Sequence, residues 1–410
     1  MALKLKIKNF KSIEEVSTEL GDLTILLGHP ASGKSNLLEA LEALGYAVKV
    51  LVEKPLGEYP EEAHIAPFNS YVRALRCVDV INRFARPRHY VAGVSIEDVN
   101  RGHRLSLNLD CTKDPNKIRM SLNIDNNIGS FEALLWERSP TTSRIGADEL
   151  TIFFDALKSF AQILGAIKPV DNINQFESIP RYVMVPRLYG FDRMGVVWNI
   201  MYGYTGSKYP FSYVEERATN LGWILYNNDD LLEDVNEIIE SSIRGLSIEP
   251  LSNGRLAFKD HGKDVGPVSV SDTVLRMLYA ITTLISSKPI RYEQSDTIIS
   301  PLIMLEEPEA HIYPLVYSKL VYTFRDALMH GSKILVTTHS GNLAERLWEE
   351  YNSSWNVRIY FVYRNTQKGT TLYEVTLPDV LEELPDLEAL ISQPEAKIKD
   401  LIENELLKIV

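Results

Sequence analysis

Cysteine is nearly absent from this chain, which has only Cys77 and Cys111 among its 410 residues. The two residues form no Cys-x-x-Cys pair and no histidine cluster lies near them, so the sequence supports neither a disulfide framework nor a zinc site. We therefore predict that both are packed thiols. Glutamine is scarce as well, a composition weakly compatible with a thermophilic source.

Long apolar runs and an excess of basic residues are also missing. No stretch of about 18 apolar residues occurs, and no charged-then-apolar leader stands at Met1, so we expect a soluble, cytoplasmic protein with no membrane partner. The formal net charge of −12 argues against a uniformly basic nucleic-acid-binding protein, although it leaves room for a local basic patch. Internal repeats and sustained heptads are absent, which excludes a long coiled-coil arm.

The sequence does contain a phosphate-binding loop between a strand and a helix. An apolar run at residues 23–27 precedes it, and leucines at helical spacing follow it. The segment Gly28-x-x-x-x-Gly33-Lys34-Ser35 fits the P-loop pattern, in which backbone N–H groups surround the β-phosphate. Lys34 then reaches the β and γ oxygens, Ser35 ligates Mg²⁺, and the helix N-terminus attracts the same anion. A fortuitous glycine-rich turn would not explain the flanking strand and helix.

Two further apolar strands end in residues suited to nucleotide hydrolysis. Glu306 and Glu307 follow the run at residues 302–305, and His339 follows the run at 334–338. Because adjacent strand residues point to opposite faces, we assign Glu306 to Mg²⁺ and Glu307 to the attacking water. His339 is placed to bond the γ-phosphate or that water. The alternatives are a solvated acidic turn and a structural histidine.

The remaining pattern predicts strands and helices on both sides of a long intervening region. We expect a strand over residues 3–7, a helix over 71–84, an antiparallel meander over 105–124, a helix over 149–167, a strand over 181–189 and a helix over 231–243. Hairpins are expected at 246–259 and 357–375, and Ser271 or Asp272 is expected to cap a helix. The acidic, helix-prone residues 377–410 are expected to be a solvated tail, with docking as the lesser alternative.

The order of these motifs resembles ATP-binding-cassette (ABC) ATPases of the SMC, RecF and OLD group, a set of AAA-family ATPases. Phe10-Lys11-Ser12 resembles the N-terminal segment that lies near nucleotide in relatives, and Leu305-Glu-Glu-Pro-Glu-Ala-His311 resembles their Walker B and D-loop. Thr337-Thr-His-Ser340 resembles the switch histidine, and residues 269–276 resemble the signature segment. The resemblance implies an ATP-binding set of Lys11, Ser12, Gly28, His29, Pro30, Ala31, Ser32, Gly33, Lys34, Ser35, Asn36, Ser271 and Asp272. It also implies catalysis by Lys34, Glu307 and His339, with Ser35 and Glu306 on the metal.

The resemblance further implies an α/β fold of the P-loop NTPase class. We predict an ABC-type head made of residues 1–50 and 246–376, with an antiparallel β-subdomain. An α/β insertion at 51–245 separates the Walker A segment from the signature helix, and 377–410 form the acidic helical tail. The expected cofactors are ATP and Mg²⁺. A head-to-tail homodimer would sandwich two ATP molecules, each between the P-loop of one subunit and the signature helix of the other.

The expected activity is Mg²⁺-dependent ATP hydrolysis that serves DNA repair or defence against foreign DNA. The candidate partners are DNA and a separately encoded nuclease or effector protein, because about 35 residues after the last hairpin are too few for the TOPRIM nuclease domain of OLD relatives. A regulatory nucleotide switch acting on a protein effector is the alternative, and a transporter subunit is a weaker one. Thr273 stands where the signature usually has glycine, and Ala31 where the P-loop usually does, so turnover is expected to be slow.

Aromatic and basic residues interleave between Arg181 and Arg217. Such a mixture can stack on and neutralise single-stranded nucleic acid, but aromatic residues also fill cores and protein interfaces. We favour packing or a protein interface. The set comprises Tyr182, Tyr189, Phe191, Trp198, Tyr202, Tyr204, Tyr209, Phe211 and Tyr213, with Arg187, Arg193 and Lys208.

Overall fold

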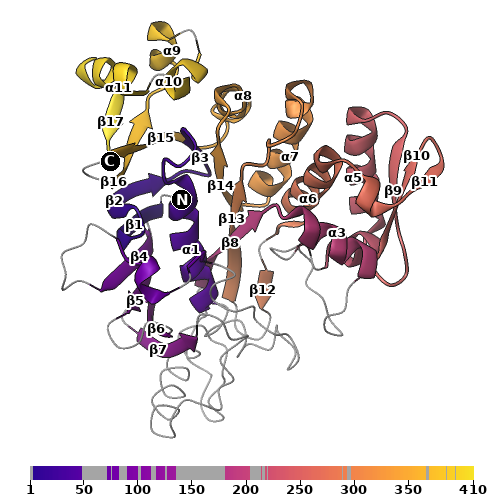
Figure 1. Ribbon diagram of the computed structural model, residues 1–410, viewed down its shortest axis with the longest axis horizontal. Coiled ribbons are helices and arrows are strands. Elements are labelled where there is room, and N and C mark those ends of the chain that lie inside the picture. Colours follow the sequence, from indigo (N-terminus) through magenta and orange to yellow (C-terminus); the bar gives the residue numbers. More distant parts are fainter. Residues whose placement is uncertain are drawn as a thin grey trace, which may run out of the picture.

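The computed structural model describes residues 3–48, 72–74, 76–82, 90–99, 103–111, 117–124, 127–134, 181–203, 214, 218, 220–288, 290–292, 297–365, 369–384, 386–392 and 394–410. Their strands form three sheets that lie side by side with helices between and over them (Figure 1). No helix in this part of the chain is long and apolar enough to cross a membrane.

The largest sheet has a parallel centre and positions the phosphate loop. Its order is β12 (Ile290–Tyr292), β13 (Thr297–Glu306), β14 (Lys333–Thr338), β3 (Leu23–Leu27), β15 (Val357–Asn365), β16 (Gly369–Val375) and β17 (Leu407–Ile409), and β8 (Arg181–Gly190) also pairs with β13. Strands β8, β13, β14, β3 and β15 run parallel, whereas β12, β16 and β17 are antiparallel additions. Parallel strands that are covered on both faces read as continuous apolar runs, and β3 and β14 are buried at every position.

Alternate residues of this sheet enter two different hydrophobic cores. Ile25, Ile303 and Val336 belong to one core, and Leu26, Met304 and Leu335 to the other. The first core is closed by α5 (Asp229–Ser242), α6 (Asp272–Ser286), α7 (Tyr317–Met329) and α8 (Gly341–Tyr351). The second contains α1 (Lys34–Val48), which is buried along almost its whole length beneath the antiparallel sheet.

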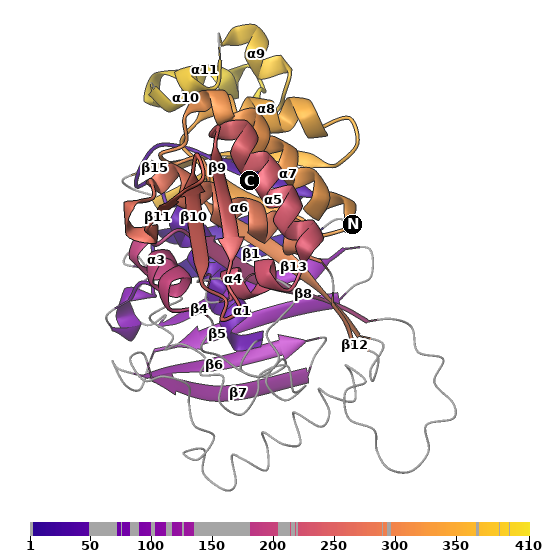
Figure 2. The same cartoon turned by 90° about the vertical axis from the view of Figure 1, so that its right-hand side faces the viewer.

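The antiparallel sheet confirms the predicted meander and extends it. Its order is β2 (Ile13–Leu20), β1 (Leu3–Phe10), β4 (Val91–Asp98), β5 (His103–Asp110), β6 (Lys117–Ile124) and β7 (Asn127–Leu134). Figure 2 shows β5, β6 and β7 of this sheet in the lower part of the view. Strand β2 was not predicted, because its charged residues hide the alternation of the buried Ile13, Val16 and Leu20.

A third sheet and the remaining helices complete the described chain. The predicted hairpin is β9 (Leu246–Pro250) and β10 (Leu256–Asp260), to which β11 (Lys263–Val265) adds a third strand. Helices α3 (Arg193–Tyr202) and α4 (Leu221–Tyr226) and the short turn η5 (Pro267–Ser269) lie beside it. After β16 the chain forms α9 (Asp379–Glu383), α10 (Glu388–Ser392) and α11 (Pro394–Glu403) and returns as β17; a short turn, η6 (Pro314–Val316), precedes α7.

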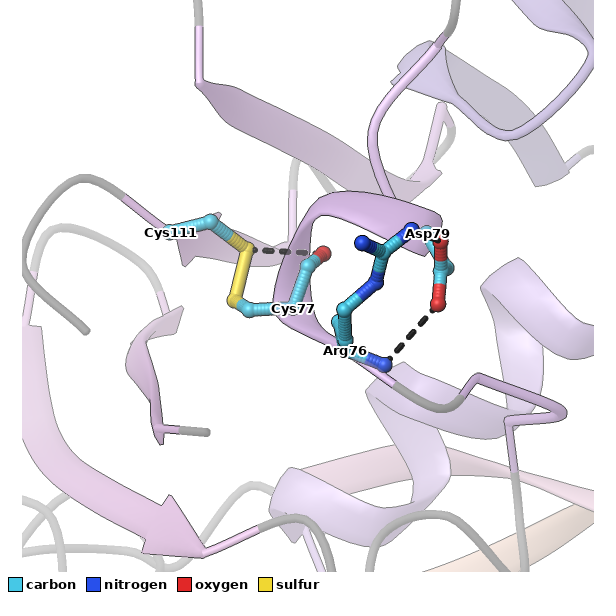
Figure 3. The surroundings of a disulfide bond; sticks show 4 residues. All are labelled: Arg76, Cys77, Asp79 and Cys111. Carbon is cyan, nitrogen blue, oxygen red and sulfur yellow. Dashed lines mark hydrogen bonds and ion pairs between the residues drawn. A yellow bond between two sulfur atoms is a disulfide. The ribbon is translucent and has the colours of Figure 1, made fainter. Parts of the chain in front are cut away.

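The prediction of packed thiols is wrong, because a disulfide joins Cys77 and Cys111 (Figure 3). Cys77 lies in the short 3₁₀ turn η3 (Cys77–Asp79), which the fold brings against the end of β5. The turn is closed by the backbone N–H of Arg76, which donates to Asp79 at 2.9 Å. A separation of 34 residues carries no pairing signal, so only the tertiary structure reveals the bond.

Two other sequence predictions differ from the described chain, and one lies outside it. In place of the helix expected over residues 71–84, the described residues 72–74 and 76–82 contain the turn η3 and an isolated bridge between Ile81 and Phe10. The solvated tail is instead packed, since Leu387, Leu390 and Leu401 are buried in the first core. The strand predicted over residues 181–189 is confirmed as β8, which pairs along all of β13. The helix expected over 149–167 lies outside the described residues.

Candidate functional site

The phosphate loop and the candidate catalytic residues emerge from one edge of the parallel sheet. Leu27 pairs with Thr338, and Thr337 pairs with Glu306, so β3, β14 and β13 end at the same level. The residues that follow these three strands are the phosphate loop, His339 and Glu307. Parallel sheets bind ligands at the carboxyl ends of their strands, and three segments far apart in sequence meet here.

Backbone conformation and close packing shape the phosphate loop. Gly33 has φ +105°, and a Cβ placed on it would collide with the Thr370 hydroxyl. Ala31 has φ +61°, a left-handed conformation that explains why glycine is usual at this position in relatives. His29, Pro30 and Ala31 are exposed and form the outer rim of the loop, while Ser32 is buried beneath it.

A hydrogen-bond network supports this loop from β16 and from the turn between β1 and β2. The Ser12 hydroxyl lies 2.6 Å from that of Thr370, and the Asn36 amide donates to Ser12, also at 2.6 Å. The Thr370 hydroxyl is also 3.2 Å from the backbone oxygen of Ser32. Ser12 and Asn36, predicted to lie near nucleotide, are thus brought against the loop, and Thr370 is a supporting residue that the sequence did not suggest.

Lys34 is buried with its ammonium group aimed back into the loop. Its Nζ donates to the backbone oxygens of Gly28 at 2.7 Å and His29 at 3.1 Å, and only 4% of the residue is exposed. Burial lowers the pKa of Lys34 to about 8, although the nearby carboxylates of Glu307, Glu309 and Glu306 oppose that shift. An anionic ligand would supply the charge that this buried cation lacks.

His339 bridges the phosphate loop and Glu307. Its Nδ1 lies 2.7 Å from the Gly28 oxygen and 3.1 Å from Lys34 Nζ, and its Nε2 lies 2.5 Å from Glu307 Oε1. The ring can donate to both oxygen acceptors only when both nitrogens carry protons. The hydrogen bond from His339 lowers the pKa of Glu307 despite partial burial, so this carboxylate is ionised at neutral pH.

Glu306 and Glu307 are separated by a backbone turn rather than by strand alternation. Glu306 is the last residue of β13, whereas Glu307 has φ +46° and its N–H donates to the Thr337 backbone oxygen at 3.1 Å. A left-handed conformation at a residue other than glycine costs energy and is held by its surroundings. The turn directs Glu307 to His339 and leaves Glu306 facing the other way.

Arg73 is a site residue that the sequence analysis missed. One of its guanidinium nitrogens donates to both oxygens of Glu306, at 2.9 and 2.7 Å. Its backbone N–H donates to the buried Glu39 at 3.1 Å, and Lys11 forms an ion pair with the same carboxylate. No motif marks Arg73, because it reaches the site from outside the P-loop and Walker segments.

Glu309 is a second missed residue, although it lies within the recognised Glu-Glu-Pro-Glu segment. Its Oε1 accepts from the Thr338 hydroxyl at 2.5 Å and from the backbone N–H of His339 at 3.1 Å. Burial raises the pKa of Glu309, and its Oε2 has no hydrogen-bond partner among the described residues. The carboxyl group thus ties the turn after Glu307 to the backbone that carries His339.

The predicted signature residues form a helix cap, an ion pair and a hydrogen bond at the start of α6. Ser271 caps α6 by accepting from the Val274 N–H, and Asp272 pairs with Arg193. Thr273, which replaces the usual glycine, donates to the His311 backbone oxygen at 2.6 Å. The start of α6 is thereby fixed to the turn that follows Glu309, and among the described residues these bonds do not join Ser271 or Asp272 to the phosphate loop of the same chain.

The residues at this edge fit Mg²⁺ held together with phosphate. Ser35 and Glu306 supply hydroxyl and carboxylate oxygens, the ligands that Mg²⁺ prefers, and Glu306 already faces a cationic guanidinium. The described residues contain no group of three or more His, Cys, Asp or Glu side chains that could hold a metal.

Two protein families match the segments that contain the phosphate loop, Glu306, Glu307 and His339. A family described as "AAA domain, putative AbiEii toxin, Type IV TA system" matches residues 221–345, which include Glu306, Glu307 and His339. A second family, described as "AAA ATPase domain", matches residues 1–60, which include the phosphate loop. No curated protein matches the sequence.

Three solved structures of SMC head domains also match the chain. An SMC head bound to the C-terminal winged-helix domain of ScpA is 15% identical, with a TM-score of 0.49 and coverage of 92% of this chain and 98% of that one. The SMC head of Thermotoga maritima is 13% identical, with a TM-score of 0.43 and coverage of 92% and 100%. An SMC head with an extended coiled coil, bound to the C-terminal domain of ScpA derived from Pyrococcus furiosus, is 13% identical, with a TM-score of 0.49 and coverage of 94% and 99%.

The two family matches agree with the motif order and with the P-loop geometry at the sheet edge. The fold is α/β, with a parallel-centred sheet that carries the P-loop and an antiparallel β-subdomain beside it. Residues 1–60 and 221–345 are thus similar to AAA-family ATPase domains.

Proposed function

We propose that this chain binds and hydrolyses Mg²⁺–ATP as a homodimer in the cytoplasm, in the service of a DNA-related process. The observation that carries the ATPase proposal is the convergence of Lys34, His339 and Glu307. Lys34 Nζ lies 3.1 Å from His339, whose other ring nitrogen lies 2.5 Å from Glu307, although 305 residues separate the lysine from the histidine. A basic group, a switch residue and an ionised carboxylate at one P-loop form a hydrolytic set.

In the proposed reaction, a water oxygen attacks the γ-phosphorus while the bond to the β–γ bridging oxygen breaks, giving ADP and phosphate. Glu307 orients that water and accepts its proton, since its lowered pKa keeps it ionised at neutral pH. His339 holds Glu307 through Nε2, and Lys34 neutralises charge on the transferred group. Ser35 and Glu306 would hold Mg²⁺, which when bound neutralises the β and γ oxygens.

The proposed dimer gives the exposed rim of the phosphate loop a role. His29, Pro30 and Ala31 face solvent in the single chain, and the N-terminus of α6 with Ser271 is the proposed donor to the γ-phosphate of the partner. ATP would then join the subunits, and hydrolysis would release them.

The disulfide bears on the proposed location in the cytoplasm. Because cytosolic disulfides persist mainly in hyperthermophiles, the Cys77–Cys111 bond and a cytoplasmic location together favour a thermophilic source.

A nucleotide switch that acts on a protein effector is the second candidate. It is favoured by an apolar face on α3, where Met194, Trp198 and Tyr202 are 68%, 60% and 54% exposed. Clustered exposed aromatic residues are typical of protein interfaces. The net charge of −12 limits any DNA contact to a local basic patch.

One set of measurements separates these candidates. ATPase rate and molar mass by light scattering should be recorded with and without DNA, at low and high salt. Stimulation by DNA that falls steeply as salt rises supports the DNA role, since neutralised phosphates release counterions. Indifference to DNA combined with stimulation by a co-purifying protein supports the effector switch. Absence of ATP hydrolysis under every condition would contradict the enzyme assignment.

A further inference from the structure

We propose that Glu388, in the C-terminal tail, positions the switch histidine by capping helix α8. The inference rests on the proposed function, because it assigns an effect on turnover to a contact outside the nucleotide site. Helix α8 begins at Gly341, two residues after His339. Tail helix α10, which begins at Glu388, packs against α8 (Figure 1).

The first backbone N–H groups of α8 donate hydrogen bonds to two side chains, those of Ser340 and of Glu388 in the tail. Glu388 Oε1 accepts from the N–H of Gly341 at 2.8 Å and from that of Asn342 at 3.4 Å. The Ser340 hydroxyl accepts from the Leu343 N–H at 3.2 Å, and the N–H of Ser340 itself donates to the Thr338 hydroxyl at 2.9 Å. All four N–H groups that a helix start leaves open are therefore satisfied, two of them by the tail.

The tail also approaches α8 too closely for any side chain at its first residue. A Cβ on Gly341 would lie 2.5 Å from the Glu388 nitrogen and 2.7 Å from the Leu387 carbonyl carbon. In the reverse direction, Glu345 of α8 accepts from the Leu387 N–H at 2.5 Å, and Leu387 is fully buried. Charge, hydrogen bonds and packing thus fix α10 in a single register on α8.

This contact continues through the backbone to His339. The Ser340 N–H donates to the Thr338 hydroxyl at 2.9 Å, and that hydroxyl donates to Glu309, which also accepts from the His339 N–H. Glu309 holds His339 on the side of the nucleotide site, and Glu388 holds Gly341 and Asn342 on the side of the tail. A shift of the tail would tilt the backbone between these two anchors, and with it the ring that orients Glu307.

The test compares three variants by steady-state ATPase kinetics and by hydrogen exchange of the peptide spanning residues 337–345. Glu388→Ala removes the cap, Glu388→Gln keeps its acceptor oxygen, and Glu383→Ala removes an exposed carboxylate from α9 as a matched control. We expect Glu388→Ala to lower kcat about 10-fold with little change in KM, because misplaced catalytic groups slow the chemical step. Exchange at Gly341 and Asn342 should quicken, Glu388→Gln should recover most of kcat, and Glu383→Ala should match the wild type.

Wild-type kcat in Glu388→Ala would overturn the inference, and so would an equal loss in Glu383→Ala. Unchanged hydrogen exchange at residues 341–342 in Glu388→Ala would show that Glu388 does not cap α8. These results leave the ATPase assignment intact as long as the wild-type chain turns over. If the wild-type chain binds but does not hydrolyse ATP, the proposed function fails first, and the assigned effect on turnover fails with it.

Discussion

The phosphate loop and the switch side of the site, which comprises Glu306, Glu307 and His339, are built in different ways. The loop takes its shape from neighbouring residues: strand β3, the left-handed Ala31 and Gly33, and the start of α1. Each residue of the switch side is held by a side chain from a remote segment, namely Arg73 for Glu306, His339 for Glu307 and Glu309 for the His339 backbone. The backbone path of the loop is therefore set by its own sequence and is supported from outside by Ser12 and Thr370, whereas the switch side is assembled from remote segments.

This difference suits the two tasks. A cradle for phosphate must exist before the ligand arrives, and a contiguous loop with fixed backbone dihedrals provides it at little further ordering cost. A switch must exchange one set of partners for another, and contacts from separate segments can be made and broken one at a time. The switch side should therefore govern turnover and the loop should govern binding, and four measurements test that division.

The largest expected effect is on the chemical step, in Glu307→Gln. The amide keeps the size of the side chain but cannot accept a proton from water, so kcat should fall by about 10²–10⁴-fold while ATP still binds. Trapped ATP should also shift the molar mass toward a dimer in light scattering. Glu349→Gln, an exposed carboxylate on α8, serves as the control and should leave kcat unchanged. Normal turnover in Glu307→Gln would move the water-orienting role to another residue.

Lys34→Ala should act on ATP binding rather than on the hydrolysis step, and it should abolish that binding. The variant removes a buried cation from a site that would hold a polyanion, with an expected loss of about 3 kcal/mol or more, which is over 100-fold in affinity. Calorimetric titration with Mg²⁺ and ATP measures this loss. Lys408→Ala, an exposed lysine of β17, is the matched control. Retained tight binding in Lys34→Ala would remove the phosphate cradle from the mechanism.

The same division explains what the sequence could predict. Leu23–Leu27, the glycine-bounded loop and the leucine stripe of α1 are neighbours in the chain, so periodicity and one motif were sufficient. Glu307 and His339 were found because each directly follows an apolar strand. Arg73 lies in a segment that we predicted to be helical, and its role depends on β13 lying opposite, which no local pattern records.

The disulfide and the tail were missed for the same physical reason. Cys77 and Cys111 are adjacent only after η3 packs on β5. Charged residues suggested a solvated tail, yet Leu387 and Leu390 bury their side chains against the first core. Alternation of polar and apolar residues shows that one face is buried, but it does not show which element covers that face.

Raising the pH by one unit above the pKa of Lys34 should weaken ATP binding about 10-fold without any mutation. Lys34 has a pKa of about 8 in the free protein, chiefly because it is buried, and only its protonated form attracts the polyanion. Affinity should therefore be constant below about pH 8 and fall about 10-fold for each further pH unit, because binding then takes up one proton. Titrations between pH 7.5 and 9.5 measure the slope. Lys34→Arg, which stays charged throughout this range, should show no slope; a flat wild-type profile would place the titrating group elsewhere.

The smallest expected effect concerns Arg73, on the metal side of the switch. Its guanidinium pairs with Glu306 while its side chain remains 64% exposed, so the ion pair is partly screened and worth at most about 1 kcal/mol. If Arg73 competes with Mg²⁺ for Glu306, Arg73→Ala should lower the Mg²⁺ concentration for half-maximal ATP binding by about 2- to 5-fold. Arg76→Ala is the matched control, because Arg76 is equally exposed and pairs with Asp79 outside the site. A higher Mg²⁺ requirement in Arg73→Ala would reverse the assignment: Arg73 would then hold Glu306 in place for the metal, and the switch side would be preorganised in the same way as the loop.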